Sequence, residues 1–153
     1  MHATCVAILD MGILIQGPPG SGKSDMALRL MDQPGCGHGG KALPAQLVAD
    51  DQVMISLKGN SLHARAPLSL RGKLEIRGLG IVPVDCLSDV RLTLAVRLVA
   101  LDMIERMPDV DKCHIEILGS KLPLVLIDPG SCSAPARIRA AALEFSGRDQ
   151  ATC

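Results

Sequence analysis

The feature that most constrains the fold is a glycine-rich segment between two runs of regular structure. Residues 17–24 read Gly-Pro-Pro-Gly-Ser-Gly-Lys-Ser, which matches the pattern G-x-x-x-x-G-K-S in full. The apolar run at 13–16 predicts a strand, and apolar residues at helical spacing after Lys23 predict a helix. A strand that enters such a loop and a helix that leaves it predict an α/β fold of the P-loop class, and the 153 residues fit a single domain spanning 1–153.

The chemistry of this motif is the binding of phosphate groups. Its glycines allow successive N–H groups to turn inward around phosphate oxygens, and the following helix points its positive dipole end at the same anion. Lys23 would contact the β- and γ-phosphates, and the Ser24 hydroxyl would ligate Mg²⁺. We therefore predict ATP and Mg²⁺ as cofactors. The predicted phosphate-binding residues are Gly17, Pro18, Pro19, Gly20, Ser21, Gly22, Lys23 and Ser24.

The composition narrows the choice of partners. The 16 basic and 16 acidic residues balance, and Phe145 is the single aromatic residue, so nucleic acid is not expected as a partner. The sequence shows no signal peptide and no apolar run long enough to span a bilayer, so no membrane partner is expected. Six cysteines without a C-x-x-C pair favour reduced thiols, which predicts a cytoplasmic protein.

Short strands and turn signals fill most of the remaining chain. The predicted strands are residues 6–9, 13–16, 47–49, 53–57, 62–66, 92–98 and 124–127. Residues 32–45 contain four glycines and two prolines, which predicts a mobile loop or an insertion. Ser133 and Pro135 predict a helix start, with an apolar face that reaches Phe145. The apolar residues at 101–107 are compatible with either a helix or a strand. The pattern of residues 74–81 fits neither a helix nor a core strand.

Two apolar runs end in an aspartate that could complete a metal site. One leads into Asp50 and Asp51, and the other leads into Asp128. Paired carboxylates at one strand end offer two roles, because one can hold a metal while the other takes the proton of an attacking hydroxyl. Asp128 precedes a Pro-Gly pair, which favours a turn there, and a turn is also the alternative for the paired aspartates.

Several segments, in this order, resemble one known family. They are His2, the P-loop followed by Asp25, Leu47-Val48-Ala49-Asp50-Asp51, and Leu74-Glu75-Ile76-Arg77-Gly78-Leu79-Gly80-Ile81. Together they resemble the catalytic domain of HPr kinase/phosphorylase. The last segment is the signature of that family and is far more specific than a P-loop. The resemblance is strong over residues 2–84 and weak beyond them.

The resemblance implies a fold, an activity and a set of site residues. The fold would be an α/β domain related to the nucleotide-binding domain of phosphoenolpyruvate carboxykinase. The activity would be ATP-dependent phosphorylation of a serine on a phosphocarrier protein (HPr-like) of the phosphotransferase system, and many members also remove that phosphate with inorganic phosphate. By motif match, the catalytic residues would be Asp50 as acid/base, Asp51, His2 and Arg77. The metal would be held by Ser24, Asp25, Asp51 and Glu75.

The chain also departs from the long members of this family. It looks like a short form that lacks their N-terminal domain, and assembly into a homo-oligomer stays open. Asp25 stands where the long members usually have Glu, and residues 35–40 look like an insertion. Arg91 would match an arginine on the mobile loop that contacts the protein substrate.

Two other functions remain open from the sequence. One is a small-molecule P-loop kinase in which Asp128 closes the metal site. The other is a nucleotide-binding regulatory module without catalysis.

Overall fold

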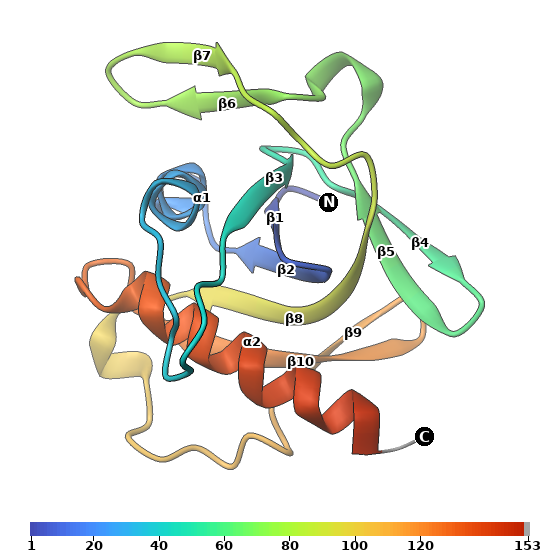
Figure 1. Ribbon diagram of the computed structural model, residues 1–153, viewed down its shortest axis with the longest axis vertical. Helices are drawn as coiled ribbons and strands as arrows, with labels where there is room; N and C mark the ends of the chain where they lie inside the picture. The colour runs from blue at the N-terminus through green and yellow to red at the C-terminus, as the bar shows by residue number, and fades with distance from the viewer. Residues whose placement is uncertain (152–153) are drawn as a thin grey trace.

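The computed structural model describes residues 1–151, and it confirms a mixed α/β fold with a central sheet (Figure 1). The strands are β1 (Thr4–Ile8), β2 (Met11–Gln16), β3 (Ala45–Ala49), β4 (Met54–Lys58), β5 (Ser61–Arg65), β6 (Lys73–Ile76), β7 (Gly80–Pro83), β8 (Val90–Leu98), β9 (His114–Ile117) and β10 (Ser120–Ile127). The helices are α1 (Lys23–Asp32) and α2 (Ala134–Ala151), with 3-10 turns η1 (Leu68–Leu70) and η2 (Leu101–Met103). Neither α-helix, within the described residues, is long and apolar enough to cross a bilayer.

The strand order decides where a site can form. The central sheet runs β3-β1-β2-β8-β10-β9, with β2, β8 and β10 parallel to one another. Since β1 is antiparallel to both β2 and β3, β3 points in the same direction as β2. The carboxyl ends of β2, β3, β8 and β10 therefore share one edge of the sheet. Ligands of open α/β sheets bind outside that edge, so the loops that follow these strands are the candidates for a site.

Both helices cover one face of the sheet, and the β4–β5 hairpin covers part of the other. Met26 and Leu30 of α1 pack with Ile138 and Phe145 of α2 in one apolar core against β1, β2 and β8. A second core on the opposite face includes side chains of β4, β5 and β9. With one aromatic residue in the chain, both cores are essentially aliphatic, as the composition requires.

Asp89 holds the β4–β5 hairpin to the start of β8. Its carboxylate lies 2.7 Å from Lys58 Nζ and 2.6 Å from His63 Nδ1. The hydrogen bond from Lys58, together with His63, lowers the pKa of the Asp89 carboxyl below its ordinary value. The side chains of His63 and Asp89 are both less than one-third exposed, so solvent screens this pair less than an open surface pair.

The contacts of Asp89 with Lys58 and His63 predict a pH-dependent contribution to the stability of the fold. A carboxyl whose pKa is lowered by folding stabilises the folded chain above its unfolded pKa of about 3.9, and the contribution is lost as pH falls through the folded value. We expect Asp89→Asn to lower the free energy of unfolding by about 1 kcal/mol at pH 7, and by much less below about pH 3. Urea unfolding of the unaltered chain and of Asp89→Asn, between about pH 3 and pH 7, measures this difference in the free energy of unfolding. An equal difference at both ends of the range would contradict the prediction.

The segment that fits neither helix nor strand from the sequence is a separate two-stranded hairpin, β6–β7. Leu74 and Ile76 pack against the core beneath it, and α1 contacts β6. At its tip, Leu79 is 71% exposed, and Ile81 on β7 is 69% exposed. In Figure 1 this hairpin stands apart from the central sheet, on the far side of α1 from α2. Its mixed composition therefore reflects one packed face and one open face.

The glycine-rich segment after α1 has no helix or strand and lies against α2. A side chain at Gly37 would place a Cβ 2.7 Å from the Ala140 backbone nitrogen, so only glycine allows this close approach. His38 Nε2 lies 3.1 Å from Glu144 Oε1. Buried Arg139 donates hydrogen bonds to the carbonyls of Leu43 and Leu30, and so joins this segment, α1 and α2.

Most predicted elements are confirmed, and a few details are different. Leu9, the last residue of the first predicted strand, lies with Asp10 in the β1–β2 turn, and β2 begins at Met11 rather than at the predicted residue 13. The open stretch after β8 forms only the 3-10 turn η2. Strand β9 was not predicted, because its sequence, His-Ile-Glu-Ile, is short and adjoins a charged loop.

Candidate active site

The P-loop connects β2 to α1 at the shared sheet edge. Gly20 and Gly22 have φ angles of 78° and 93°, and a Cβ added at either would meet no atom within 4 Å, so the loop surrounds an open hollow. Lys23 is 7% exposed, and its Nζ donates to the carbonyl oxygens of Gly17 at 3.0 Å and Pro18 at 3.1 Å. An ammonium has three donors, so one remains for a ligand.

Two features of this loop fit a phosphate group. Ser21 Oγ is buried without a hydrogen-bond partner, and buried hydroxyls without partners are rare in native proteins. The helix N-cap is Gly22, with no side-chain hydrogen bond that would satisfy the first N–H groups of α1. An anion in the hollow would satisfy both, and the helix dipole would favour it.

Asp50 is the best-connected acid of the site. It is 5% exposed, and its two carboxylate oxygens accept hydrogen bonds from Ser24 Oγ at 2.8 and 3.0 Å. Thr4 Oγ1 donates to the same carboxylate at 2.8 Å, and the backbone N–H of Glu75 donates at 3.2 Å. The P-loop, the first strand and the β6–β7 hairpin therefore converge on one carboxylate. The alternative from the sequence, in which Asp50 only forms a turn after β3, would not require these hydrogen bonds from three separate segments.

Asp51 occupies a different position from its neighbour. Its backbone is left-handed, with a φ of 67°, which is uncommon for a residue other than glycine. This conformation turns the side chain to the mouth of the site, where it is 59% exposed and Oδ1 lies 3.3 Å from His2 Nδ1. A bridge between His2 and Gln52 fixes the two segments together. The pair of aspartates thus places one acid beneath the P-loop and the other at the rim.

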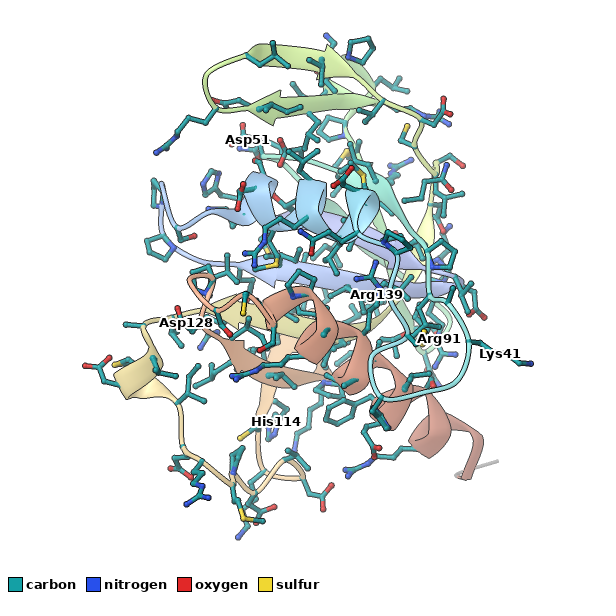
Figure 2. All side chains as sticks on the ribbon, turned by 60° about the vertical axis from the view of Figure 1, so that its left-hand side comes forward. Lys41, Asp51, Arg91, His114, Asp128 and Arg139 are labelled. Carbon is teal, nitrogen blue, oxygen red and sulfur yellow. The ribbon has the colours of Figure 1, made fainter. Side chains whose placement is uncertain are left out.

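A cavity of about 590 Å³ joins these parts, within the usual range for ligand pockets. Its walls are the first turn of α1, the rim around His2 and Asp51, the β6–β7 hairpin and the loop after β10. Figure 2 shows Asp51 on one side of α1 and Asp128 on the other. The lining residues are His2, Thr4, Pro19, Gly20, Ser21, Gly22, Lys23, Ser24, Asp25, Leu28, Asp51, Glu75, Ile76, Arg77, Pro129 and Gly130.

The predicted metal ligands meet in this cavity without forming a metal cage. Ser24, Asp25, Asp51 and Glu75 all line it. Among residues 1–151, no group of three or more histidine, cysteine, aspartate or glutamate side chains is placed to hold a metal ion. Mg²⁺ in phosphoryl-transfer sites is usually held by one or two carboxylates, waters and the substrate phosphates, and the residues present fit that mode.

The structure brings the predicted site residues together and corrects one assignment. The predicted catalytic residues His2, Asp51 and Arg77 line the cavity, and Asp50 lies beneath it, bonded to three lining residues. Arg91 does not lie on a mobile loop. It pairs with His63 inside the β-sheet, at the end of β8 away from the P-loop, so its predicted place on a loop was wrong.

The loop after β10 belongs to the site in a way the sequence did not reveal. Asp128 Oδ1 accepts a hydrogen bond from the Gly130 N–H at 2.9 Å, so the predicted turn is confirmed, and Asp128 does not line the cavity. Its neighbours Pro129 and Gly130 do line it. The available signal was topological, because the carboxyl ends of parallel strands meet at one edge. The sequence analysis also did not name Thr4, Leu28 and Ile76, which line the cavity.

Comparison with known proteins identifies the family. The family model described as HPr Serine kinase C-terminal domain matches residues 1–150. The chain belongs to this family. The signature in β6–β7 and the P-loop therefore belong to an HPr serine kinase C-terminal domain, and the mixed α/β P-loop fold is the one that this family has.

Curated relatives carry the name HPr kinase/phosphorylase. The protein from Cupriavidus metallidurans is 34% identical over 137 residues, an alignment that covers 83% of this chain and 39% of the relative. The protein from Chlorobium limicola is 36% identical over 135 residues, covering 81% of this chain and 38% of the relative. The chain therefore spans about two fifths of the length of these curated relatives.

A solved structure agrees with the sequence comparison. The HPr(Ser) kinase/phosphatase from Coxiella burnetii superposes with a TM-score of 0.77 at 27% identity. The match covers 99% of this chain and 95% of that chain. The similarity in fold therefore extends over nearly the whole of this chain.

Proposed function

We propose that this chain transfers the γ-phosphoryl group of ATP to a serine hydroxyl of a phosphocarrier protein of the phosphotransferase system. The observation that carries the proposal is the convergence of Ser24, Thr4 and the Glu75 N–H on the Asp50 carboxylate, directly beside the phosphate-binding loop. The names of the relatives, HPr kinase/phosphorylase and HPr(Ser) kinase/phosphatase, support the choice of acceptor.

The proposed roles of the phosphate-binding residues follow from the loop. MgATP, when bound, supplies the transferring phosphoryl group and the charge of the metal. The P-loop N–H groups hold phosphate oxygens, and Lys23 directs an ammonium toward them. Ser24, Asp25, Asp51 and Glu75 are the proposed oxygen ligands for the metal, because they line the same cavity.

The acceptor chemistry is assigned to the acids and to Arg77. A serine hydroxyl is a poor nucleophile until its proton is drawn off, and Asp50 is the carboxylate held nearest the P-loop serine. Asp50 is therefore the proposed acid/base residue. Arg77, on the exposed hairpin that forms one wall, would stabilise negative charge on the transferring group. His2 and Asp51 hold the rim through which a protein-borne serine would enter.

The direct test is transfer to a purified acceptor. The chain is incubated with Mg²⁺, labelled ATP and an HPr-like phosphocarrier, and mass spectrometry locates the phosphate. The proposal expects one phosphoserine, absent when that serine is replaced by alanine. Labelling of a small molecule would favour the small-molecule kinase, and ATP binding without any labelled acceptor would favour the regulatory module. Since ATP is a cytoplasmic metabolite, the proposed reaction is cytoplasmic.

The reverse reaction is tested in the same assay. Inorganic phosphate would attack the phosphoserine, restoring the serine hydroxyl and forming pyrophosphate. Addition of phosphate to the phosphorylated carrier should therefore release pyrophosphate if this activity is present. Retention of all the phosphoserine would limit the chain to the kinase direction.

Thr4 should contribute to the rate through Asp50. Thr4 is fully buried, and Thr4→Val keeps the shape of the side chain while it removes the hydrogen bond to the carboxylate. We expect a loss of about 1.4 kcal/mol in transition-state stabilisation, about tenfold in transfer rate. Thr4→Ser keeps the hydroxyl and should retain most of the rate. Equal rates for Thr4→Val and the unaltered chain would contradict the role.

A further inference from the structure

The loop after β10 is a wall of the cavity that the proposed roles leave unused. Pro129 and Gly130 line the cavity, and Figure 2 shows Asp128, the residue before them, on the side of α1 opposite the β6–β7 hairpin. Neither Pro129 nor Gly130 has a side chain that could do acid/base chemistry, and Asp128 does not line the cavity and accepts the Gly130 N–H in its own turn. The loop can therefore contribute only to the shape of the cavity. It can do so only if other contacts fix its position.

Arg29 of α1 holds this loop. Its Nη1 donates to the carbonyl of Pro129 at 2.8 Å, and its Nη2 donates to the carbonyl of Ser131 at 2.9 Å. The side chain is half-buried, which strengthens hydrogen bonds from a charged donor. A planar guanidinium can bind two carbonyls at a fixed angle, whereas a lysine ammonium has no such fork. Arg29 thus fixes the loop to the same helix that begins in the P-loop.

The direction of the nucleotide follows from the two ends of the cavity. The proposed acceptor chemistry lies at the end of the cavity lined by Asp51 and Arg77, with Asp50 beneath it. Figure 2 shows Asp51 on the β6–β7 side of α1. The γ-phosphate must face that end if transfer occurs there. The nucleoside then leaves the P-loop toward the other end, where Pro129 and Gly130 form the wall.

We propose that Arg29 is a positioning residue for the nucleotide, because it fixes Pro129 and Gly130 as the wall against which the nucleoside of ATP lies. The inference rests on the proposed function for the direction of the nucleotide. It adds a subsite and the residue that holds it. Arg29 touches neither the phosphates nor the acceptor, so its effect should be confined to ligands that carry a nucleoside.

The test compares two ligands that differ by the nucleoside. Titration calorimetry with Mg²⁺ measures the affinity of the intact chain for ATP and for inorganic tripolyphosphate. We expect Arg29→Met to weaken ATP binding about tenfold and to leave tripolyphosphate binding within about twofold. The affinity of Arg29→Lys for ATP should lie between that of Arg29→Met and that of the unaltered chain. Arg137→Met removes an exposed arginine near the start of α2 and serves as the matched control, with both affinities unchanged.

Several results would overturn the inference. Equal losses for ATP and tripolyphosphate would mean that Arg29 acts on the P-loop or on the fold, and an unchanged ATP affinity would mean that the loop is not a subsite. If Arg29→Met does not fold, Asp128→Ala loosens the same loop from its own turn and should reproduce the selective loss. Unchanged ATP binding by that variant would be decisive against the inference.

The outcome is separable from that of the proposed function. An unaltered chain that binds ATP but labels no phosphocarrier would defeat the proposed function, while the selective effect of Arg29 could still be measured. An unaltered chain that binds no ATP would defeat both.

Discussion

Replacement of Asp50 by asparagine should lower the rate of phosphoserine formation by about a thousandfold, in the middle of the range for a lost acid/base group. The asparagine side chain has the same shape, but it carries no charge and cannot accept the proton of a serine hydroxyl at neutral pH. It would also replace one of the two oxygens that accept from Ser24 with an amide nitrogen. The measurement is the single-turnover rate of transfer to the phosphocarrier.

Two controls separate chemistry from binding and folding. ATP affinity should change far less than the rate, because the P-loop and Lys23 are retained. Asp10→Asn alters an exposed aspartate in the β1–β2 turn and should leave the rate unchanged. If Asp50→Asn keeps more than about a tenth of the rate, the acid/base role is excluded. Transfer to a small molecule spared by Asp50→Asn would instead favour the small-molecule kinase.

Replacement of Arg139 by methionine should have the largest effect on stability, about 3 kcal/mol. Arg139 is 1% exposed, and its Nε and Nη2 donate to the carbonyls of Leu43 and Leu30 at 2.8 and 2.6 Å. Leu30 lies in the last turn of α1, where backbone carbonyls have no partner within the helix. Methionine fills a similar volume but leaves both buried carbonyls without a donor.

The charge on Arg139 persists despite its burial. Burial lowers the pKa of its guanidinium below the ordinary value, yet arginine starts so high that it stays charged at neutral pH. Urea unfolding with a constant m-value measures the loss. Arg137→Met is the matched control, since that side chain is exposed on the same helix. A difference below about 1 kcal/mol would show that the two hydrogen bonds contribute little net stability.

The parts of the fold that local sequence determines were predictable. The P-loop fixes a strand before it and a helix after it, and the structure has β2 and α1 at those places. Asp50 and Asp51 follow an apolar run, and that run is the buried strand β3. The order of motifs placed the chain in a family, and the family model matches the same residues.

The parts that depend on distant contacts were not predictable. The glycine-rich segment after α1 has no periodic pattern, and its position is decided by Arg139 and by the close approach of Gly37 to α2. The difference between Asp50 and Asp51 depends on a left-handed backbone at Asp51, which adjacent identical residues do not reveal. The wall at Pro129 and Gly130 required the strand order, which no single segment contains.

The central claim is that nucleotide phosphates bind in the cavity whose lining residues Thr4, Ser24 and Glu75 hold the Asp50 carboxylate directly beneath it. A crystal structure of the chain with Mg²⁺ and a non-hydrolysable ATP analogue tests it most directly. The account predicts phosphates enclosed by the P-loop and contacted by Lys23, with the γ-phosphate on the side of Asp50. A γ-phosphate that points toward Pro129 and Gly130, or a nucleotide bound outside the P-loop, would contradict it.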